Sequence, residues 1–187
     1  GSLLSDILLA STAKARDVDT ACIRIWDVQE NRCLQTLRGG HKSTVVALCF
    51  SPDGQYLVSS GKDRRLCLWG RHQKRSVSGT QNMFSLCAAI DASHKRIVWG
   101  AHFCPYKPSM FASCSRDGSV KVWAIRKLNT DNIEIVEVNQ FHPTTVNANN
   151  KPESVTAIAF APCRLKHSSL LAIGLESGFI ELWKVPT

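Results

Sequence analysis

A short phrase that ends in tryptophan recurs four times along the chain, and this repeat limits the possible folds more than any other feature. The four copies are Ile23-Arg24-Ile25-Trp26, Leu66-Cys67-Leu68-Trp69, Val120-Lys121-Val122-Trp123 and Ile180-Glu181-Leu182-Trp183. Their tryptophans are 43, 54 and 60 residues apart. A period of this size predicts one supersecondary unit per repeat, with each unit stacked on its neighbours. The two longer spacings indicate insertions in loops.

A second recurring phrase precedes three of the tryptophans and predicts what each unit contains. It begins at Val45, Val98 and Val155, and Ser51-Pro52-Asp53-Gly54 in the first copy is typical of a tight turn. Each unit therefore reads as strand, turn, strand, tight turn and strand. The almost continuously apolar segment 44–50 predicts an inner strand buried on both faces. The more polar segment 32–37 predicts an outer strand.

These phrases resemble the WD40 family, with Trp26-Asp27 as the WD dipeptide and Gly40-His41 closing the first unit. The resemblance implies an all-β propeller of about four blades. It also implies that a His, Ser, Asp and Trp tetrad is hydrogen-bonded inside each regular blade. Matched position by position, the tetrads are His41, Ser59, Asp63 and Trp69, then His94, Ser113, Asp117 and Trp123. In the fourth unit Lys151, Ile173 and Ser177 replace the first three members. The family geometry gives these residues a structural role, so no catalytic residue is predicted.

The first and last units read as incomplete blades of a single domain, residues 1–187. The first unit begins at a predicted second strand around residues 7–13, and the last has no outer strand. Blade ends are expected near Leu37, Ala88, Phe141 and Thr187. The sequence thus predicts an open arc: the C-terminal part of a larger, seven-bladed propeller, a short isoform, or a partial chain.

Longer phrases resemble the family of second subunits of the Elongator complex, at the end of their second propeller. They are the segment from His94 to Trp99, which carries a tryptophan inside a first strand, and Gly174-Leu175-Glu176-Ser177-Gly178. The resemblance implies a non-catalytic scaffold subunit of a machine that modifies wobble uridines in tRNA. Its expected partners are the scaffold and catalytic subunits of that complex, with tRNA as a further contact. No small-molecule substrate or cofactor is expected.

The net charge of +8 favours acidic partners without choosing among them. Basic residues fall in turns expected at one rim: Lys14, Arg16, Lys62, Arg64, Arg65 and Arg116. Others fall in loops expected at the opposite rim and are the candidate partner-binding or RNA-binding residues: Arg71, Lys74, Arg75, Arg126, Lys127, Arg164 and Lys166. Solvated charges, a protein contact and an RNA backbone contact all fit this pattern. A generic WD40 adaptor that reads a peptide remains a further alternative.

The cysteines indicate a reducing compartment, and the histidines show no pattern of metal ligands. Eight cysteines are scattered with no CxxC pair, which predicts buried free thiols and a cytoplasmic or nuclear protein. Histidines 72, 102, 142 and 167 lack metal-ligand spacing. No apolar run approaches the roughly 18 residues of a membrane helix. The polar insertion Asn139–Glu153 is long for a connection between blades.

Overall fold

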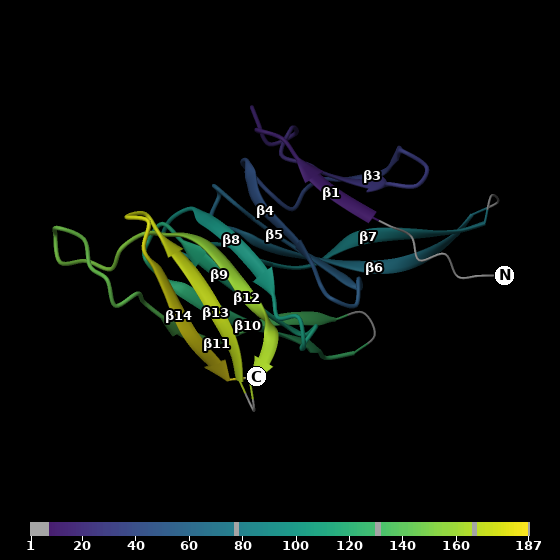
Figure 1. The fold of residues 1–187 in the computed structure, drawn as a ribbon. Coiled ribbons are helices and arrows are strands. Elements are labelled where there is room, and N and C mark those ends of the chain that lie inside the picture. The colour runs from purple at the N-terminus through teal and green to yellow at the C-terminus, as the bar shows by residue number, and fades with distance from the viewer. Residues whose placement is uncertain (1–7, 77–78, 130–131, 166–167, 187) are drawn as a thin grey trace.

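A computed structural model describes residues 8–76, 79–129, 132–165 and 168–186, and all regular structure in these ranges is β. The strands form four antiparallel sheets in chain order (Figure 1). The first sheet contains β1 (Leu8–Thr12), β2 (Ile23–Asp27) and β3 (Arg32–Leu37), and the second contains β4 (Val45–Phe50), β5 (Tyr56–Gly61), β6 (Leu66–Ser76) and β7 (Gly79–Ile90). The third contains β8 (Val98–Phe103), β9 (Met110–Ser115), β10 (Val120–Lys127) and β11 (Ile133–Phe141), and the fourth contains β12 (Val155–Leu165), β13 (Ser168–Leu175) and β14 (Ile180–Pro186). No described helix could cross a membrane.

Each sheet is a meander in which consecutive strands pair, because tight turns reverse the chain after every strand. In the turn between β4 and β5, Ser51 Oγ donates to Asp53 Oδ1 (2.6 Å) and Gly54 takes a φ of 66°. Glycine has no Cβ to oppose that left-handed backbone, so the predicted turn chemistry appears as the sequence indicated.

The apolar core lies between the sheets, in three clusters that fill the three junctions. The alternation of side chains along β5 shows how this works. Leu57 packs toward the first sheet with Ile23 and Ile25, whereas Val58 packs toward the third sheet with Phe103 and Phe111. A strand that has a neighbouring sheet on each side needs apolar residues at successive positions, which explains the weak alternation in the sequence.

Burial on both faces was predicted for segment 44–50, and the structure corrects this. Every residue of β5 and of β9 is buried, but only Val45 of β4 is, and the other residues of β4 are half-buried. The reason is position: β4 is the first strand of its sheet and has a strand on only one side, whereas β5 lies between β4 and β6. The polar outer strand was predicted correctly, since half of the residues of β3 are exposed and only Leu37 is buried.

The sheets at the two ends of the stack each have a neighbour on one side only. Leu9 in β1 is 55% exposed, and Ile180 and Leu182 in β14 are 72% and 65% exposed. The adjacent residues Leu8 and Trp183 point the other way, into the clusters between sheets. The sheets end at Leu37, Ile90, Phe141 and Pro186, and in the second sheet this lies two residues beyond Ala88.

Hydrogen bonds also join neighbouring sheets across their junctions. The side-chain amide of Gln35 in β3 donates to the Phe84 carbonyl oxygen of β7 (2.8 Å) and accepts from the Phe84 N–H (2.8 Å). Ser60 Oγ in β5 donates to the carbonyl oxygen of Val98 in β8 (3.2 Å). These bonds satisfy buried backbone groups of strands that have no partner on that side.

Candidate functional site

In the second sheet the four predicted tetrad residues form one hydrogen-bonded network. His41 lies in the connection before β4, Ser59 in β5, Asp63 in the following turn and Trp69 in β6. Trp69 Nε1 donates to Ser59 Oγ (2.9 Å), and Ser59 Oγ lies 2.8 Å from His41 Nε2. His41 Nδ1 is 3.1 Å from the nearer carboxylate oxygen of Asp63. A network of this kind fixes the connection between blades onto the strands of the next blade.

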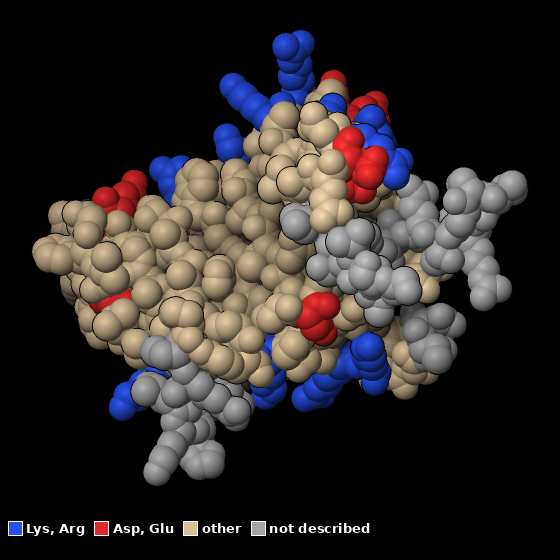
Figure 2. All heavy atoms as spheres, turned by 45° about the vertical axis from the view of Figure 1, so that its right-hand side comes forward, with Lys and Arg blue, Asp and Glu red and all other residues tan. Residues whose placement is uncertain are grey.

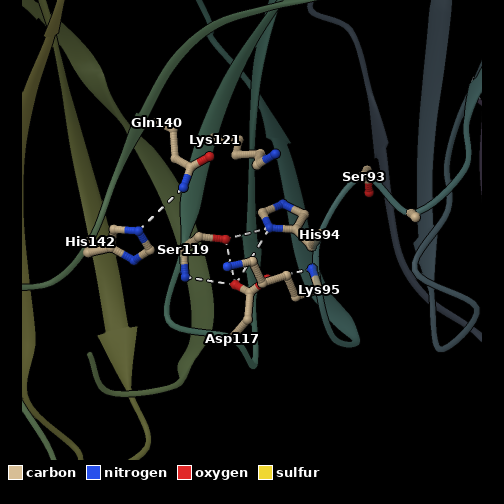
Figure 3. A pocket seen from close by; sticks show the side chains of 9 residues that line it. Ser93, His94, Lys95, Asp117, Ser119, Lys121, Gln140 and His142 are labelled. Carbon is tan, nitrogen blue, oxygen red and sulfur yellow. Dashed lines mark hydrogen bonds and ion pairs between the residues drawn. The ribbon is translucent and has the colours of Figure 1, made fainter. Parts of the chain in front are cut away.

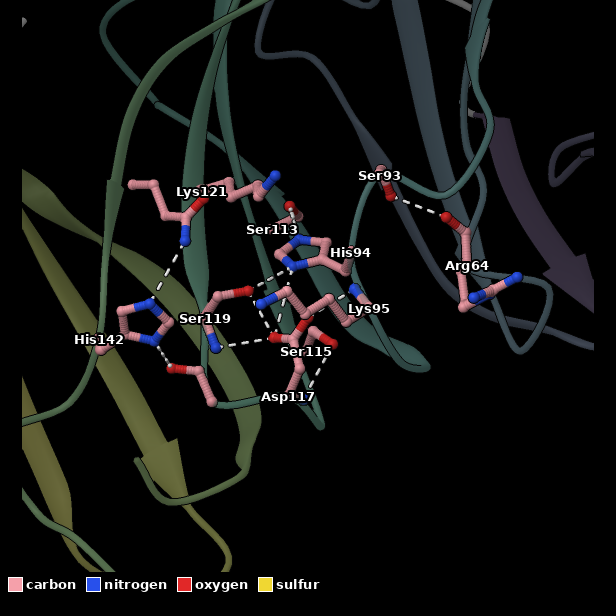
Figure 4. Close-up of polar contacts among 12 residues, drawn as sticks. Arg64, Ser93, His94, Lys95, Ser113, Ser115, Asp117, Ser119, Lys121 and His142 are labelled. Carbon is pink, nitrogen blue, oxygen red and sulfur yellow. Dashed lines mark hydrogen bonds and ion pairs between the residues drawn. The ribbon is translucent and has the colours of Figure 1, made fainter. Parts of the chain in front are cut away.

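The third sheet has the same network with one additional member, and Figure 4 shows its His94, Ser113, Asp117 and Ser119. Trp123 Nε1 donates to Ser113 Oγ (2.8 Å), which lies 2.7 Å from His94 Nε2. His94 Nδ1, however, is 3.8 Å from Asp117 and 2.7 Å from Ser119 Oγ, which in turn is 2.5 Å from Asp117 Oδ1. Ser119 therefore stands between the imidazole and the carboxylate.

The direction of these bonds follows from which groups can only donate or only accept. The indole N–H only donates and an ionised carboxylate only accepts. Ser113 therefore accepts from Trp123 and donates to His94 Nε2. His94 Nδ1–H then donates to Ser119, whose hydroxyl donates to Asp117. Every polar atom in this buried chain has a partner, and fully satisfied buried networks make a structure rigid.

The two aspartates stay ionised in these networks. Burial alone would raise the pKa of Asp117, but the nearby His94 imidazole and the hydrogen bonds from Ser119 and backbone N–H groups outweigh it and hold the pKa well below its usual value. Burial has the same opposing effect on Asp63, whose pKa is lowered by His41 and by backbone N–H groups. Each carboxylate also accepts from the backbone N–H of the residue after the histidine, Lys42 (2.7 Å) or Lys95 (2.6 Å).

The geometry of the two networks does not favour a catalytic triad. Ser59 and Ser113 are fully buried, and each receives an indole N–H. A nucleophile needs access to substrate as well as a neighbouring base. The hydroxyls are held inside the sheet junctions, where their hydrogen bonds stabilise the blades.

Sequence reasoning missed Ser11 in the first sheet. Ser11 in β1 accepts from Trp26 Nε1 (2.8 Å), as Ser59 and Ser113 do in their own sheets. It stands 15 residues before its tryptophan, whereas the other two serines stand 10 residues before theirs. The longer turn between β1 and β2 hides this equivalence, and allowing for its extra length would have revealed it.

The fourth sheet replaces the tetrad with two glutamates. Ile173 is fully buried and offers no hydroxyl, so Trp183 Nε1 donates to Glu181 Oε2 (3.1 Å). Ser177 takes the place of the aspartate, and its N–H and hydroxyl donate to Glu153 (2.7 and 2.8 Å). Glu181 also accepts from the backbone and hydroxyl of both Thr144 and Thr145. The insertion before β12 is thereby held against the fourth sheet.

These bonds determine the ionisation of Glu181. Burial alone would raise the pKa of Glu181, but the hydrogen bonds from Thr145 and Thr144 outweigh it and lower the pKa to about 2. The predicted polar insertion is also shorter than expected, because residues 139–141 belong to β11.

A cavity of about 280 Å³ opens above the third-sheet network (Figure 3). Lys121 on its wall lies 2.8 Å from Glu137 and 5.5 Å from the centre of the Trp123 ring. His142 Nδ1 lies 2.8 Å from the Gly118 carbonyl oxygen, to which it donates. Much of the polar wall is thus engaged within the protein.

The basic residues predicted at the two rims occupy different kinds of structure. Those predicted in turns lie in connections between strands. Arg65 among them ties two parts of the fold together, because its Nε is 2.7 Å from Asp91 and its guanidinium donates to the Gly40 carbonyl oxygen. In Figure 2 basic side chains gather along the upper and lower edges of the face in view, and its middle is mostly uncharged.

The loop positions predicted for the candidate partner-binding residues were wrong for all those that the structure describes. The hairpins extend further than expected, so the following residues are in strands: Arg71, Lys74, Arg75, Arg126, Lys127 and Arg164. Lys166 lies outside the described residues, as do the side chains of Lys74, Arg75 and Arg164.

Two of the candidate residues meet at the junction between the second and third sheets. Arg71 in the middle of β6 and Lys127 at the end of β10 both line a cavity of about 500 Å³. Lys127 Nζ lies 5.8 Å from the centre of the Tyr56 ring, which belongs to the second sheet. Sequence reasoning named these two cations without predicting that they share one cavity.

The cysteines are free in the described part of the chain, as expected, but not uniformly buried. Cys67, Cys104 and Cys114 are buried, and burial raises the pKa of Cys67 and of Cys114 to about 12. Cys33 on the outer strand is exposed, and the side chain of Cys163 lies outside the described residues.

Antiparallel sheets stacked face to face, with a His, Ser, Trp and Asp network in each of the two central ones, are the architecture of WD40 repeats. Residues 31–70 and 85–124 match the family described as WD domain, G-beta repeat. The first match runs from β3 into β6, so one sequence repeat supplies the outer strand of one sheet and three strands of the next.

Relatives of this chain include proteins named Elongator complex protein 2. The chain is 34% identical over 180 residues to the one from Schizosaccharomyces pombe, 35% over 184 residues to that from Dictyostelium discoideum and 36% over 183 residues to that from Drosophila melanogaster. These alignments cover 96%, 96% and 95% of this chain but 21%, 19% and 21% of the relatives. The chain thus spans about a fifth of the length of the curated relatives that it matches.

Proposed function

We propose that this chain is a non-catalytic scaffold that helps to assemble an Elongator-type complex. The observation that carries the proposal is the similarity, over 96% of the chain, to proteins named Elongator complex protein 2. A rigid stack of sheets suits this role, because pre-organised surfaces bind with little loss of conformational entropy.

The finer parts of the proposal concern the reaction and the partners. The complex would modify wobble uridines in tRNA, and its scaffold and catalytic subunits would bind the surfaces of the blades. The chemistry would belong to the catalytic subunit, in keeping with the buried serines of both networks. Free cysteines fit a reducing compartment, and we place the protein in the cytoplasm and nucleus.

Affinity purification followed by mass spectrometry tests this proposal. The tagged protein is purified from cells with nuclease present, so that RNA cannot bridge partners. We expect the scaffold and catalytic subunits of the complex to be recovered. A stable set of unrelated partners would refute the Elongator assignment.

Two variants make the experiment sharper. Trp123→Ala removes a buried ring that packs on Phe111, a change that typically costs about 3–5 kcal/mol, and it should reduce recovery of the partners. Leu128→Ala changes a residue that is 59% exposed and directly follows β10, and it should leave recovery unchanged. Equal recovery with both variants would mean that blade structure does not support assembly.

A further inference from the structure

A cavity of about 420 Å³ lies between the connections of the third and fourth sheets, and its size is within the roughly 300–1,000 Å³ of ligand sites. We name it the junction cleft, and the lining residues that matter here are Arg96, Arg116, Glu153, Ser154, Glu176 and Ser177. Arg96 precedes β8 and Arg116 follows β9, so both cations come from the third sheet. Glu153 precedes β12 and Glu176 follows β13, so both carboxylates come from the fourth.

The charges on the two sides of the junction cleft do not neutralise each other. In the described part of the chain, the side chains of Arg96, Arg116 and Glu176 take part in no hydrogen bond or ion pair. The Glu153 carboxylate, in contrast, already accepts from the N–H and the hydroxyl of Ser177 (2.7 and 2.8 Å). Two cations and one carboxylate are therefore free to bind a ligand.

The backbone holds both sides of the junction cleft in place. The N–H of Arg116 donates to a carbonyl oxygen of the segment before β8 (3.0 Å), and that of Glu176 donates to one of the segment before β12 (3.0 Å). The two sheets also approach closely, since a Cβ at Gly118 would lie 2.8 Å from the Glu153 carbonyl oxygen. A site formed before the ligand arrives loses less conformational entropy on binding.

An unpartnered hydroxyl gives a second, independent indication of a ligand at this cavity. Ser154 lines the junction cleft and is 9% exposed, and its Oγ is buried without a hydrogen-bond partner among the described residues. Most buried hydroxyls in native proteins have a partner, so this one is a candidate contact for a polar ligand.

We propose that the junction cleft binds an extended protein segment in which an acidic residue stands next to a basic one. Successive side chains of an extended chain point to opposite sides. The acidic side chain then meets Arg96 and Arg116, whose guanidinium groups match the shape of a carboxylate, while the basic one meets Glu176. This inference rests on the scaffold role proposed above, because it names a surface for assembly and the chemistry of the segment that the surface binds.

Ligands of a single charge sign fit the junction cleft less well. A wholly acidic segment brings negative charge against Glu176, and a wholly basic one brings positive charge against Arg96 and Arg116. A nucleic acid has the first difficulty at every position, because its backbone carries one negative charge per nucleotide.

The test is fluorescence anisotropy of the full-length protein with the labelled peptide Gly-Ser-Glu-Lys-Glu-Lys-Ser-Gly. Versions with four glutamates, four lysines or four serines at the central positions complete the set. We expect the mixed-charge peptide to bind at least about tenfold more tightly than the other three. Arg96→Gln with Arg116→Gln should weaken its binding by about tenfold, since each exposed ion pair contributes roughly up to fivefold.

A matched control removes two cations from the corresponding connections of the second sheet. Lys42 precedes β4 and Lys62 follows β5, both are exposed, and neither lines the junction cleft. Lys42→Gln with Lys62→Gln lowers the net charge equally and should leave the affinity within about twofold. Equal loss with both pairs would show attraction by total charge alone and would overturn the proposal.

The arginine pair should keep its fold, because both side chains are exposed and have no partner among the described residues. Its urea midpoint should match that of the unchanged protein, and unchanged peptide affinity would then refute the proposal. Glu176→Gln should bring the four-glutamate peptide to within about twofold of the mixed-charge one. In the unchanged protein, equally tight binding of these two peptides would overturn the mixed-charge preference.

Two further outcomes separate this inference from its alternatives. Displacement of the peptide by single-stranded RNA at equal charge concentration, through the same two arginines, would overturn the proposal and identify a nucleic acid as the occupant. Failure of the mixed-charge peptide to bind, with partner subunits still recovered by the unchanged protein, would refute the junction cleft and leave the scaffold role intact. Peptide binding without recovery of those subunits would support the junction cleft and refute the Elongator assignment.

Discussion

Removal of the Ser119 hydroxyl is the sharpest available test of how the third blade is locked. Ser119 is 4% exposed, accepts from His94 Nδ1 (2.7 Å) and donates to Asp117 Oδ1 (2.5 Å). In Ser119→Ala both contacts are lost, and His94 and Asp117 are left 3.8 Å apart, beyond hydrogen-bonding distance. A buried polar group without a partner costs about 1–3 kcal/mol, so we expect the free energy of unfolding to fall by about 2 kcal/mol.

Urea unfolding of the purified protein, followed by tryptophan fluorescence, measures this loss. With a slope of about 2 kcal/mol/M, a loss of about 2 kcal/mol lowers the midpoint by about 1 M. The control is Ser85→Ala, at an exposed serine whose hydroxyl is 3.5 Å from His72, and it should change stability by less than about 0.5 kcal/mol.

A second measurement asks whether Ser119 acts through Asp117. If it does, Asp117→Ala should cost less in the Ser119→Ala background, with a coupling energy of about 0.5–3 kcal/mol. A loss below about 0.5 kcal/mol for Ser119→Ala alone would refute the reasoning. It would mean that His94 and Asp117 close to a direct contact, as His41 and Asp63 have in the second sheet.

Three further predictions concern charge, the insertion and a glycine. The fold lowers the pKa of Asp117 below its usual value of 3.8 and lowers that of Glu181 from 4.5 to about 2, so the unfolded chain takes up protons first as the pH falls. Stability should therefore be constant above about pH 5 and decline below it. Asp117→Asn should flatten that decline, as measured by urea midpoints at each pH. Glu181→Gln should speed hydrogen exchange at the Thr145 amide, which now donates to Glu181 at 3.0 Å, and unchanged protection would contradict the role given to this carboxylate. Gly118→Ala should destabilise the protein by about 1–3 kcal/mol, because φ is +78° and a Cβ would lie 2.8 Å from the Glu153 carbonyl oxygen; an unchanged thermal midpoint would show that the contact relaxes freely.

The repeat architecture and both regular tetrads were predictable because their signals are local. The tryptophan phrases, the Ser-Pro-Asp-Gly turn and the spacing between His41 and Asp63 all fall within a single repeat. Backbone pairing between adjacent strands preserves such spacings, so each residue could be matched to its position by counting. The polar outer strand β3 was equally predictable, since its polar side chains by themselves indicate exposure to solvent.

The tertiary structure decided what depends on neighbouring sheets or on loop length. The Ser11 contact was hidden by a longer turn, and Ser119 could be recognised only once His94 and Asp117 were seen 3.8 Å apart. The half-burial of β4 depends on its edge position in the sheet. One cavity is lined by both Arg71 and Lys127 at a junction between two sheets, and no local pattern in the sequence indicates that they share it. Sequence periodicity therefore determined the blades and their hydrogen-bonded tetrads. Packing between blades determined which distant side chains meet, because those contacts join residues that no repeat spacing relates.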